Sequence, residues 1–162
     1  MKSYNFCYGI KDSDEVEAIA DITEKTGFFS GEEVAIAREL AEESLKNQNA
    51  GDYFFIKALG NDGKIIGYTC HGRIPGSIHS WDLYWIVISP ESQGSGTGRA
   101  LINHAHSLIK TQEGKKVYAE TSSRSQYKPT RSFYLSCGYS QAAFLDDFYG
   151  PEDSKVIYVF EL

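Results

Sequence analysis

Three glycines stand at alternate positions in SPESQGSGTG, residues 89–98, directly after the apolar run YWIVI. Glycine permits positive φ angles and a close approach of the backbone to a ligand, but it costs conformational entropy. A helix that begins at such a loop presents free N–H groups and a partial charge of about +0.5, which together attract anions. The stretch therefore predicts an anion-binding cradle, and a glycine-rich turn without a ligand is the alternative interpretation.

Two familiar phosphate-binding patterns do not fit this stretch. The dinucleotide fingerprint GxGxxG needs glycine at its sixth position, which is Arg99 counted from Gly94 and Leu101 counted from Gly96. Glu120, at the end of the next expected strand, could bind the ribose of a dinucleotide. The glycine motif that accompanies such an acidic residue is absent, however. A P-loop needs a following Gly-Lys-Ser/Thr, which is also absent. A pyrophosphate cradle of another type remains.

The elements that position this loop are indicated by periodicity and capping signals. Asp12 and Ser30 are each followed three residues later by glutamate, which predicts two helices that end near Gly27 and Asn47. Another amphipathic helix follows the glycines to about Gln112, and a short one carries Pro129 in its first turn. Strand patterns cover residues 2–10, 53–59, 64–73, 81–89, 116–121, 139–149 and 155–162. The order is β α α β β β α β α β β.

Two motifs carry a resemblance to a known family. QGSGTG, residues 93–98, resembles the Q/R-x-x-G-x-G/A motif of the GNAT superfamily of acyl-CoA-dependent N-acyltransferases. RSFYLSCGY, residues 131–139, resembles the family's helix and turn ending in F/L-Y-x-x-x-G-F/Y. The element order agrees along nearly the whole chain. The resemblance implies one GNAT-like α/β (α+β) domain over residues 1–162, with a mixed, mostly antiparallel twisted sheet of about seven strands flanked by about four helices.

The resemblance also implies acetyl-CoA as the acyl donor and no metal. In the family the glycine loop holds the pyrophosphate of coenzyme A, largely through backbone N–H groups. The corresponding residues here are Gln93, Gly94, Ser95, Gly96, Thr97, Gly98 and Arg99. The pantetheine arm would pair with the backbone of Ile86, Val87 and Ile88. One position departs from the family, because Tyr127 stands where many members have an asparagine that contacts the cofactor.

Acetyl transfer to an amine needs a base, because an alkylammonium has a pKa of about 10. Asp82 and Glu120 are the candidate bases, each on the face of a strand that it shares with a tyrosine two residues away. The alternative is that both are solvated or ion-paired carboxylates at strand ends. Tyr134 aligns with the family tyrosine and is the candidate acid for the leaving thiolate, or else an amphipathic core tyrosine.

The predicted function is transfer of an acetyl group from acetyl-CoA to the primary amine of a small molecule, directly within a ternary complex. Alternatives are a non-catalytic acyl-CoA-binding or sensor domain, and acetylation of a protein amine. By analogy with the family, the acceptor pocket would include aromatic side chains between the first two helices, on the fourth strand and in the last hairpin, although core positions are the alternative. These are Phe28, Phe29, Tyr84 and Tyr149, the last of them within the run Asp146-Asp147-Phe148-Tyr149, which is expected to line the pocket as a whole.

The amino-acid composition limits the classes of partner that we expect for this protein. The 162 residues carry 16 basic and 22 acidic side chains, a net charge of −6, without a dense Lys/Arg cluster, which disfavours nucleic acid. Three separated cysteines indicate neither a disulfide framework nor a zinc site. No stretch has the length and hydropathy of a signal peptide or a membrane span, so we expect a cytoplasmic protein with no membrane partner. A homodimer is expected only because family members often dimerise.

Overall fold

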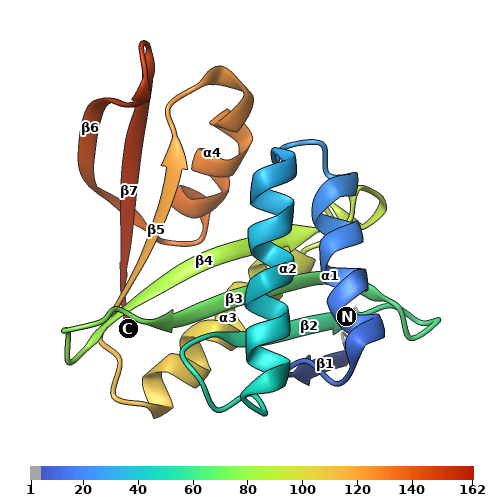
Figure 1. Cartoon of the computed structure of the whole chain (residues 1–162). Helices are drawn as coiled ribbons and strands as arrows, with labels where there is room; N and C mark the ends of the chain where they lie inside the picture. The colour runs from blue at the N-terminus through green and yellow to red at the C-terminus, as the bar shows by residue number, and fades with distance from the viewer. Residues whose placement is uncertain (1–4) are drawn as a thin grey trace. The chain divides into compact units, whose positions relative to one another are not determined.

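The computed structural model describes residues 5–162 and has the element order that the sequence predicts (Figure 1). Residues 2–4 of the predicted first strand lie outside that range. The four helices are α1 (Ser13–Lys25), α2 (Gly31–Lys46), α3 (Thr97–Thr111) and α4 (Lys128–Ser136). The seven strands are β1 (Asn5–Tyr8), β2 (Phe54–Leu59), β3 (Ile65–Arg73), β4 (Ser80–Ile88), β5 (Lys116–Ser122), β6 (Ser140–Gly150) and β7 (Asp153–Glu161).

The strands form one mixed sheet, hydrogen-bonded in the order β1-β2-β3-β4-β5-β7-β6. The pairs β1–β2, β2–β3, β5–β7 and β6–β7 are antiparallel. The pair β4–β5 is parallel, with Ser80–Asp82 opposite Lys116–Tyr118. The predicted fold class, a mixed and mostly antiparallel sheet with four helices, is therefore confirmed.

The chain divides into two compact units. The first contains residues 1–72 and 85–105, and the second contains residues 73–84 and 106–162. Strand β4 and helix α3 therefore contribute residues to both units. The single domain over residues 1–162 stays a prediction.

Capping side chains begin the first two helices where the sequence predicts. The Asp12 carboxylate accepts a 3.0 Å hydrogen bond from the Glu15 backbone N–H, and Glu15 in turn accepts from the N–H of Lys11. Ser30 and Glu33 form a reciprocal capping box. These bonds satisfy backbone donors that a helix start otherwise leaves free, so local sequence determines both boundaries.

The core of the first unit comes from the apolar faces of α1 and α2 and from the strands β2 to β4. Its buried members are Ile10, Val16, Ile19, Ile22, Ala41, Phe55, Tyr68, Cys70 and Val87. The buried residues of α1 recur at three- and four-residue spacing, so one face of the helix packs into this core; they are Val16, Ile19, Ala20, Ile22 and Thr23. Burying each large side chain contributes about 1.5–3 kcal/mol, so this packing is what holds the unit together.

The second unit shows the period-2 alternation expected of a strand with one buried face. On β5, Val117, Ala119 and Thr121 are buried, whereas Glu120 is exposed and Ser122 is half-buried. Strand β6 is one of the two edge strands of the sheet and is exposed over most of its length. The face of β5 that carries Glu120 is therefore the one available to a ligand.

Candidate active site

The glycine stretch follows β4 in the first unit and leads into α3. Gly94 and Gly96 have φ angles of +70° and +92°, which L-residues rarely adopt. A Cβ built on Gly94 would meet nothing within 4 Å, so the space beside this residue is open. The glycines are therefore required by the backbone path, and the space beside Gly94 would accept a ligand atom.

Side chains of the loop hold it in shape. The Gln93 Nε2 donates to the Ile88 carbonyl at 3.2 Å, and the Ser95 hydroxyl donates to the Ser92 carbonyl at 2.5 Å. Ser95 Oγ also lies 2.7 Å from the hydroxyl of Thr97, the buried first residue of α3. Because α3 is 15 residues long, its start carries the full N-terminal dipole, which favours an anion. Gly98 follows in the first turn of α3, and Arg99 is exposed.

The end of β4 lies beyond the parallel ladder. Its pairing with β5 covers Ser80–Asp82, and Ile86, Val87 and Ile88 do not take part in it. A Cβ on Gly67 of β3 would lie 3.0 Å from the Val87 carbonyl oxygen and 2.7 Å from a methyl group of Ile88. Glycine at this position thus lets the backbone of β3 approach the end of β4, a requirement that the sequence pattern did not reveal.

In the second unit, the two candidate bases are brought together with a lysine. Asp82 lies opposite Tyr118 in the β4–β5 ladder, and Glu120 follows two residues later on the same face of β5. The Lys155 ammonium, from β7, lies 2.7 Å from the Glu120 carboxylate. Burial raises the pKa of Asp82 to about 6, with a further increase from the charge of Glu120 and an opposing effect of Lys155. The two carboxylates therefore interact electrostatically, as the two members of one site would.

Two aromatic rings of β6 face the same lysine. The Lys155 Nζ lies 3.9 Å from the centroid of the Phe148 ring and 5.6 Å from that of Tyr149. Both rings are about half exposed, and they meet edge to face at 5.0 Å. The sequence predicts that Phe148 and Tyr149 line the acceptor pocket, which stays a prediction, but it gives no signal for Lys155. Strand alternation places Lys155 between two buried positions. Its contacts with Glu120 and Phe148 depend on the pairing of β5, β6 and β7.

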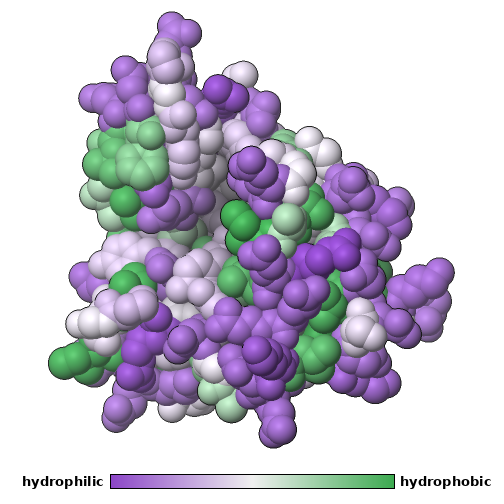
Figure 2. Space-filling model, in the orientation of Figure 1, coloured by the Kyte–Doolittle hydropathy of each residue, from purple (hydrophilic) through white to green (hydrophobic). Residues whose placement is uncertain are grey.

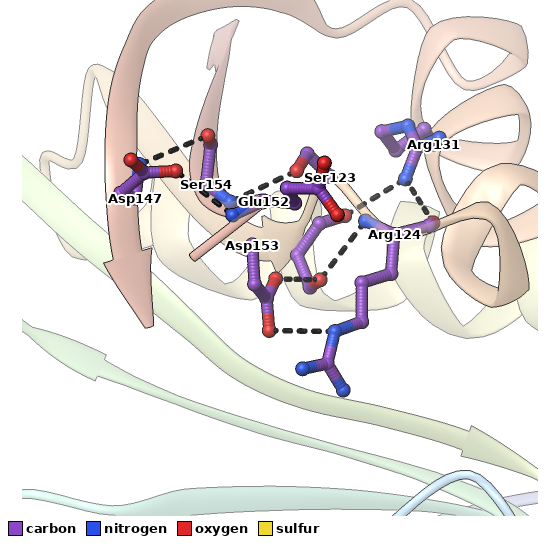
Figure 3. Close-up of polar contacts among 8 residues, drawn as sticks. Ser123, Arg124, Arg131, Asp147, Glu152, Asp153 and Ser154 are labelled. Carbon is purple, nitrogen blue, oxygen red and sulfur yellow. Dashed lines mark hydrogen bonds and ion pairs between the residues drawn. The ribbon is translucent and has the colours of Figure 1, made fainter. Parts of the chain in front are cut away.

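A second polar network surrounds the end of β5 and joins it to β7 and α4 (Figure 3). The Asp153 carboxylate accepts a hydrogen bond from the Ser122 hydroxyl and lies 3.0 Å from the Arg124 Nε. Arg131 of α4 donates to the carbonyls of Ser122 and Arg124 at 2.8 and 2.9 Å. The bonds tie the last residue of β5 to the start of β7 and to α4. They therefore orient the segment between Glu120 and Tyr134.

Tyr134 lies on α4 and is buried, with 5% of its surface exposed. Its ring lies 5.4 Å from that of Tyr139 and 5.7 Å from that of Tyr158. Burial raises the pKa of Tyr134 above the usual range of a phenol, with a smaller effect of Cys137. The phenol is protonated at neutral pH, and the raised pKa makes it a weaker proton donor than a phenol in water.

The remaining predicted residues differ in their surroundings. Phe28 and Tyr84 are partly exposed, and Tyr127 is half-buried in the turn before α4. Phe29 packs against the core of the first unit, with its ring edge to face with Trp85 at 4.9 Å. The structure thus gives Phe29 a core role, and its place in an acceptor pocket stays a prediction, as do the roles of the other three.

The described residues contain no group of three or more His, Cys, Asp or Glu side chains arranged to hold a metal ion. Over the same range, no helix has the length and apolar character that crossing a membrane requires.

The family model of the GNAT acetyltransferase domain matches residues 50–141 of this chain. A crystal structure of a Desulfovibrio desulfuricans protein assigned to the GNAT acetyltransferases is 37% identical over 98% of this chain and 99% of that one, with a TM-score of 0.94. Two more distant structures share the fold. An aminoglycoside 6'-N-acetyltransferase complexed with coenzyme A is 14% identical over 96% of each chain, with a TM-score of 0.74. The ribosomal-protein-S18-alanine N-acetyltransferase of Escherichia coli is 16% identical over 97% of this chain and 94% of that one, with a TM-score of 0.71.

No curated protein matches the chain. The family match covers more than half of the residues, includes the glycine loop and Tyr134, and agrees with the fold. The chain belongs to the GNAT family of acetyltransferases and is an enzyme of that class.

Proposed function

We propose that this protein transfers the acetyl group of acetyl-CoA to the primary amine of a small molecule, directly within a ternary complex. The observation that carries the proposal is the pair of carboxylates Asp82 and Glu120 on neighbouring strands, where burial raises the pKa of Asp82 to about 6. A base with this pKa is ionised at neutral pH and still takes up a proton. An alkylammonium acceptor needs such a base before it can attack.

The glycine loop would hold the pyrophosphate of acetyl-CoA. The positive φ angles at Gly94 and Gly96, the open space beside Gly94 and the start of α3 all suit a bound anion. The aminoglycoside enzyme of the same fold was crystallised with coenzyme A, which supports the same ligand here. The pantetheine arm would pair with the backbone at Ile86–Ile88.

In the proposed reaction a carboxylate takes a proton from the acceptor ammonium, directly or through water. The free amine nitrogen attacks the thioester carbonyl, so a C–N bond forms and the C–S bond breaks. A backbone N–H near Ile86 or Val87 would stabilise the oxyanion, an effect worth about 3–4 kcal/mol in comparable enzymes. The Tyr134 phenol would donate its proton to the departing thiolate, and the proton that the nitrogen loses as the amide forms would restore the phenol.

A small-molecule acceptor is favoured by the exposed aromatic side chains Tyr84 and Tyr149 of the second unit, which would contact the body of the amine. Free cysteines at positions 7, 70 and 137 support a reducing compartment, which we propose to be the cytoplasm. We also propose that residues 1–162 act as one domain.

The test is thiol release from acetyl-CoA in the presence of a broad amine panel. The panel contains amino acids, polyamines, aminoglycosides and peptides with free N-termini, with an amine-free reaction as the background. We expect at least one small amine to accelerate release, and the acetylated amine to appear by mass spectrometry. Acceleration by peptides alone would favour a protein acceptor. Tight acetyl-CoA binding without acceleration by any amine would favour a binding or sensor role.

A further inference from the structure

The ion pair of Lys155 and Glu120 joins two neighbouring strands diagonally. In the β5–β7 ladder Lys155 stands opposite Ser122, and Glu120 stands opposite Ile157, so the lysine reaches back along the sheet to its partner. The two charged atoms lie 2.7 Å apart, and only 14% of the Lys155 side chain is exposed. A partly buried pair at this distance is screened much less by salt than a surface pair is.

The Phe148 ring holds the lysine from another side. Its centroid lies 3.9 Å from the ammonium, within the range in which the negative face of an aromatic ring attracts a cation. Strand β6 departs from regular pairing with β7 between Leu145 and Gly150, and this irregular segment carries the ring. Figure 2 shows hydrophobic surface over β6, at the upper left of the view. The ammonium is therefore held between a carboxylate and a ring.

This arrangement makes the two carboxylates of the site unequal. Glu120 is neutralised by Lys155, whereas Asp82 forms no ion pair within the described residues. The titratable and charged groups that act on Asp82 in the second unit are Glu120 of β5 and Lys155 of β7, and Tyr118 of β5 is its partner across the ladder. The Glu120 oxygen that faces the ammonium is occupied by this contact, whereas no ion pair engages the oxygens of Asp82 in the part of the chain that the structure describes.

We propose that Lys155 is a positioning residue of the acetyl-transfer site. Lys155 holds Glu120 in an ion pair, and Asp82 is then the carboxylate that takes the proton of the acceptor ammonium. The proposal rests on the proposed function and goes beyond it by choosing between the two carboxylates. The proton moves from the acceptor ammonium to an Oδ atom of Asp82, which is neutral until it releases the proton to water.

The first experiment measures the titration of Asp82 by NMR of the carboxyl carbons, without acetyl-CoA or amine. Lys155→Met removes the cation and should raise the pKa of Asp82 by roughly one unit, because Asp82 then faces only the negative charge of Glu120. Glu120→Gln should shift the same pKa downwards, and Lys155→Arg should retain the wild-type value. Lys116→Met is the matched control, since it breaks another lysine–glutamate pair of the second unit, with Glu161 at 3.5 Å.

The second experiment follows kcat/KM against pH with the amine found in the panel. We expect the acid limb of the profile to move to higher pH in Lys155→Met and to lower pH in Glu120→Gln, with about a fivefold loss at pH 6 for Lys155→Met and almost no loss at pH 8.5. Thermal unfolding of each variant checks that the fold is retained.

The outcomes separate this proposal from the proposed function. If no amine is acetylated by the wild-type enzyme, the proposed function fails, while the NMR titration still tests the Lys155 effect on Asp82. If the wild-type enzyme is active but Lys155→Met moves neither the Asp82 pKa nor the acid limb, the role of Lys155 is overturned. An acid limb that persists in Asp82→Asn and disappears in Glu120→Gln would make Glu120 the base and overturn the choice of Asp82.

Discussion

The imidazole Nε2 of His106 and the hydroxyl oxygen of Tyr139 lie 2.8 Å apart in the interior of the second unit. Phe160 stacks on the imidazole at 4.0 Å, and burial lowers the pKa of His106 to about 4. The Tyr139 backbone N–H donates to the Tyr134 carbonyl at 3.1 Å. The contact between His106 and Tyr139 thus helps to hold the end of α4, where Tyr134 lies, against the interior of the second unit.

The first prediction concerns the pH dependence of stability at His106. An unfolded histidine titrates at a pKa of about 6.5, so between pH 6.5 and 4 the unfolded chain binds more protons than the folded one. The stability present above pH 6.5 should therefore fall by about 2–3 kcal/mol as pH drops towards 4. Urea unfolding at pH 7.5 and 4.5 measures this loss. His106→Gln should reduce it, whereas His104→Gln, two residues away on α3, should not.

The second prediction concerns Asp82, whose pKa is raised by burial to about 6. The effect of pH on stability has the opposite sign to that of an ion-paired carboxylate. Between pH 4 and 6 the folded state binds more protons than the unfolded state, so the free energy of unfolding decreases as pH rises through this range. An increase of about two pKa units corresponds to about 3 kcal/mol, but Asp82 is only half-buried and solvent screens its charge, so Asp82→Asn should stabilise the protein by about 1 kcal/mol at pH 8, and much less at pH 4. It should also lower kcat by about 100-fold. Asp21→Asn on the exposed face of α1 is the control, and an equal gain there would contradict a specific effect of Asp82.

The third prediction separates chemistry from binding at Tyr134. Tyr134→Phe keeps the buried ring and removes only the hydroxyl, so we expect kcat to fall by about 100-fold while the Kd for acetyl-CoA stays within about twofold. Steady-state kinetics and calorimetric titration give the two values. Tyr139→Phe is the comparison, because it removes another buried hydroxyl and should mainly lower stability. Unchanged turnover in Tyr134→Phe would remove the phenol from the mechanism.

The fourth prediction uses two glycines of equal backbone strain. Gly94 and Gly27 both have φ of +70°, and an added Cβ meets nothing within 4 Å at either position. Gly94→Ala and Gly27→Ala should each destabilise the fold by about 1 kcal/mol, because alanine disfavours this conformation. Only Gly94→Ala should weaken acetyl-CoA binding, by about tenfold or more, since its methyl group occupies the space proposed for the ligand. Equal Kd values for the two variants would exclude a cradle at Gly94.

Local signals in the sequence predicted much of the fold. Capping pairs such as Ser30 with Glu33 act over a single turn, so a helix start can be recognised without knowledge of the rest of the chain. The alternation of β5 predicted which face carries Glu120, because neighbouring side chains on a strand point to opposite faces. The spacing of QGSGTG and RSFYLSCGY identified the family, and the family match agrees.

The sequence alone thus determined the order of the elements and the position of the glycine loop, and it supplied the candidates Asp82, Glu120 and Tyr134. Each of these follows from residues that are close together in the chain. Tertiary structure alone decided that Lys155 meets Glu120 and Phe148, and that burial shifts the pKa values of Asp82 and His106 in opposite directions. Strand pairing brings together residues that are distant in sequence, and the pKa of a side chain depends on the charges and the solvent around it. Neither quantity is encoded by any short segment of the chain.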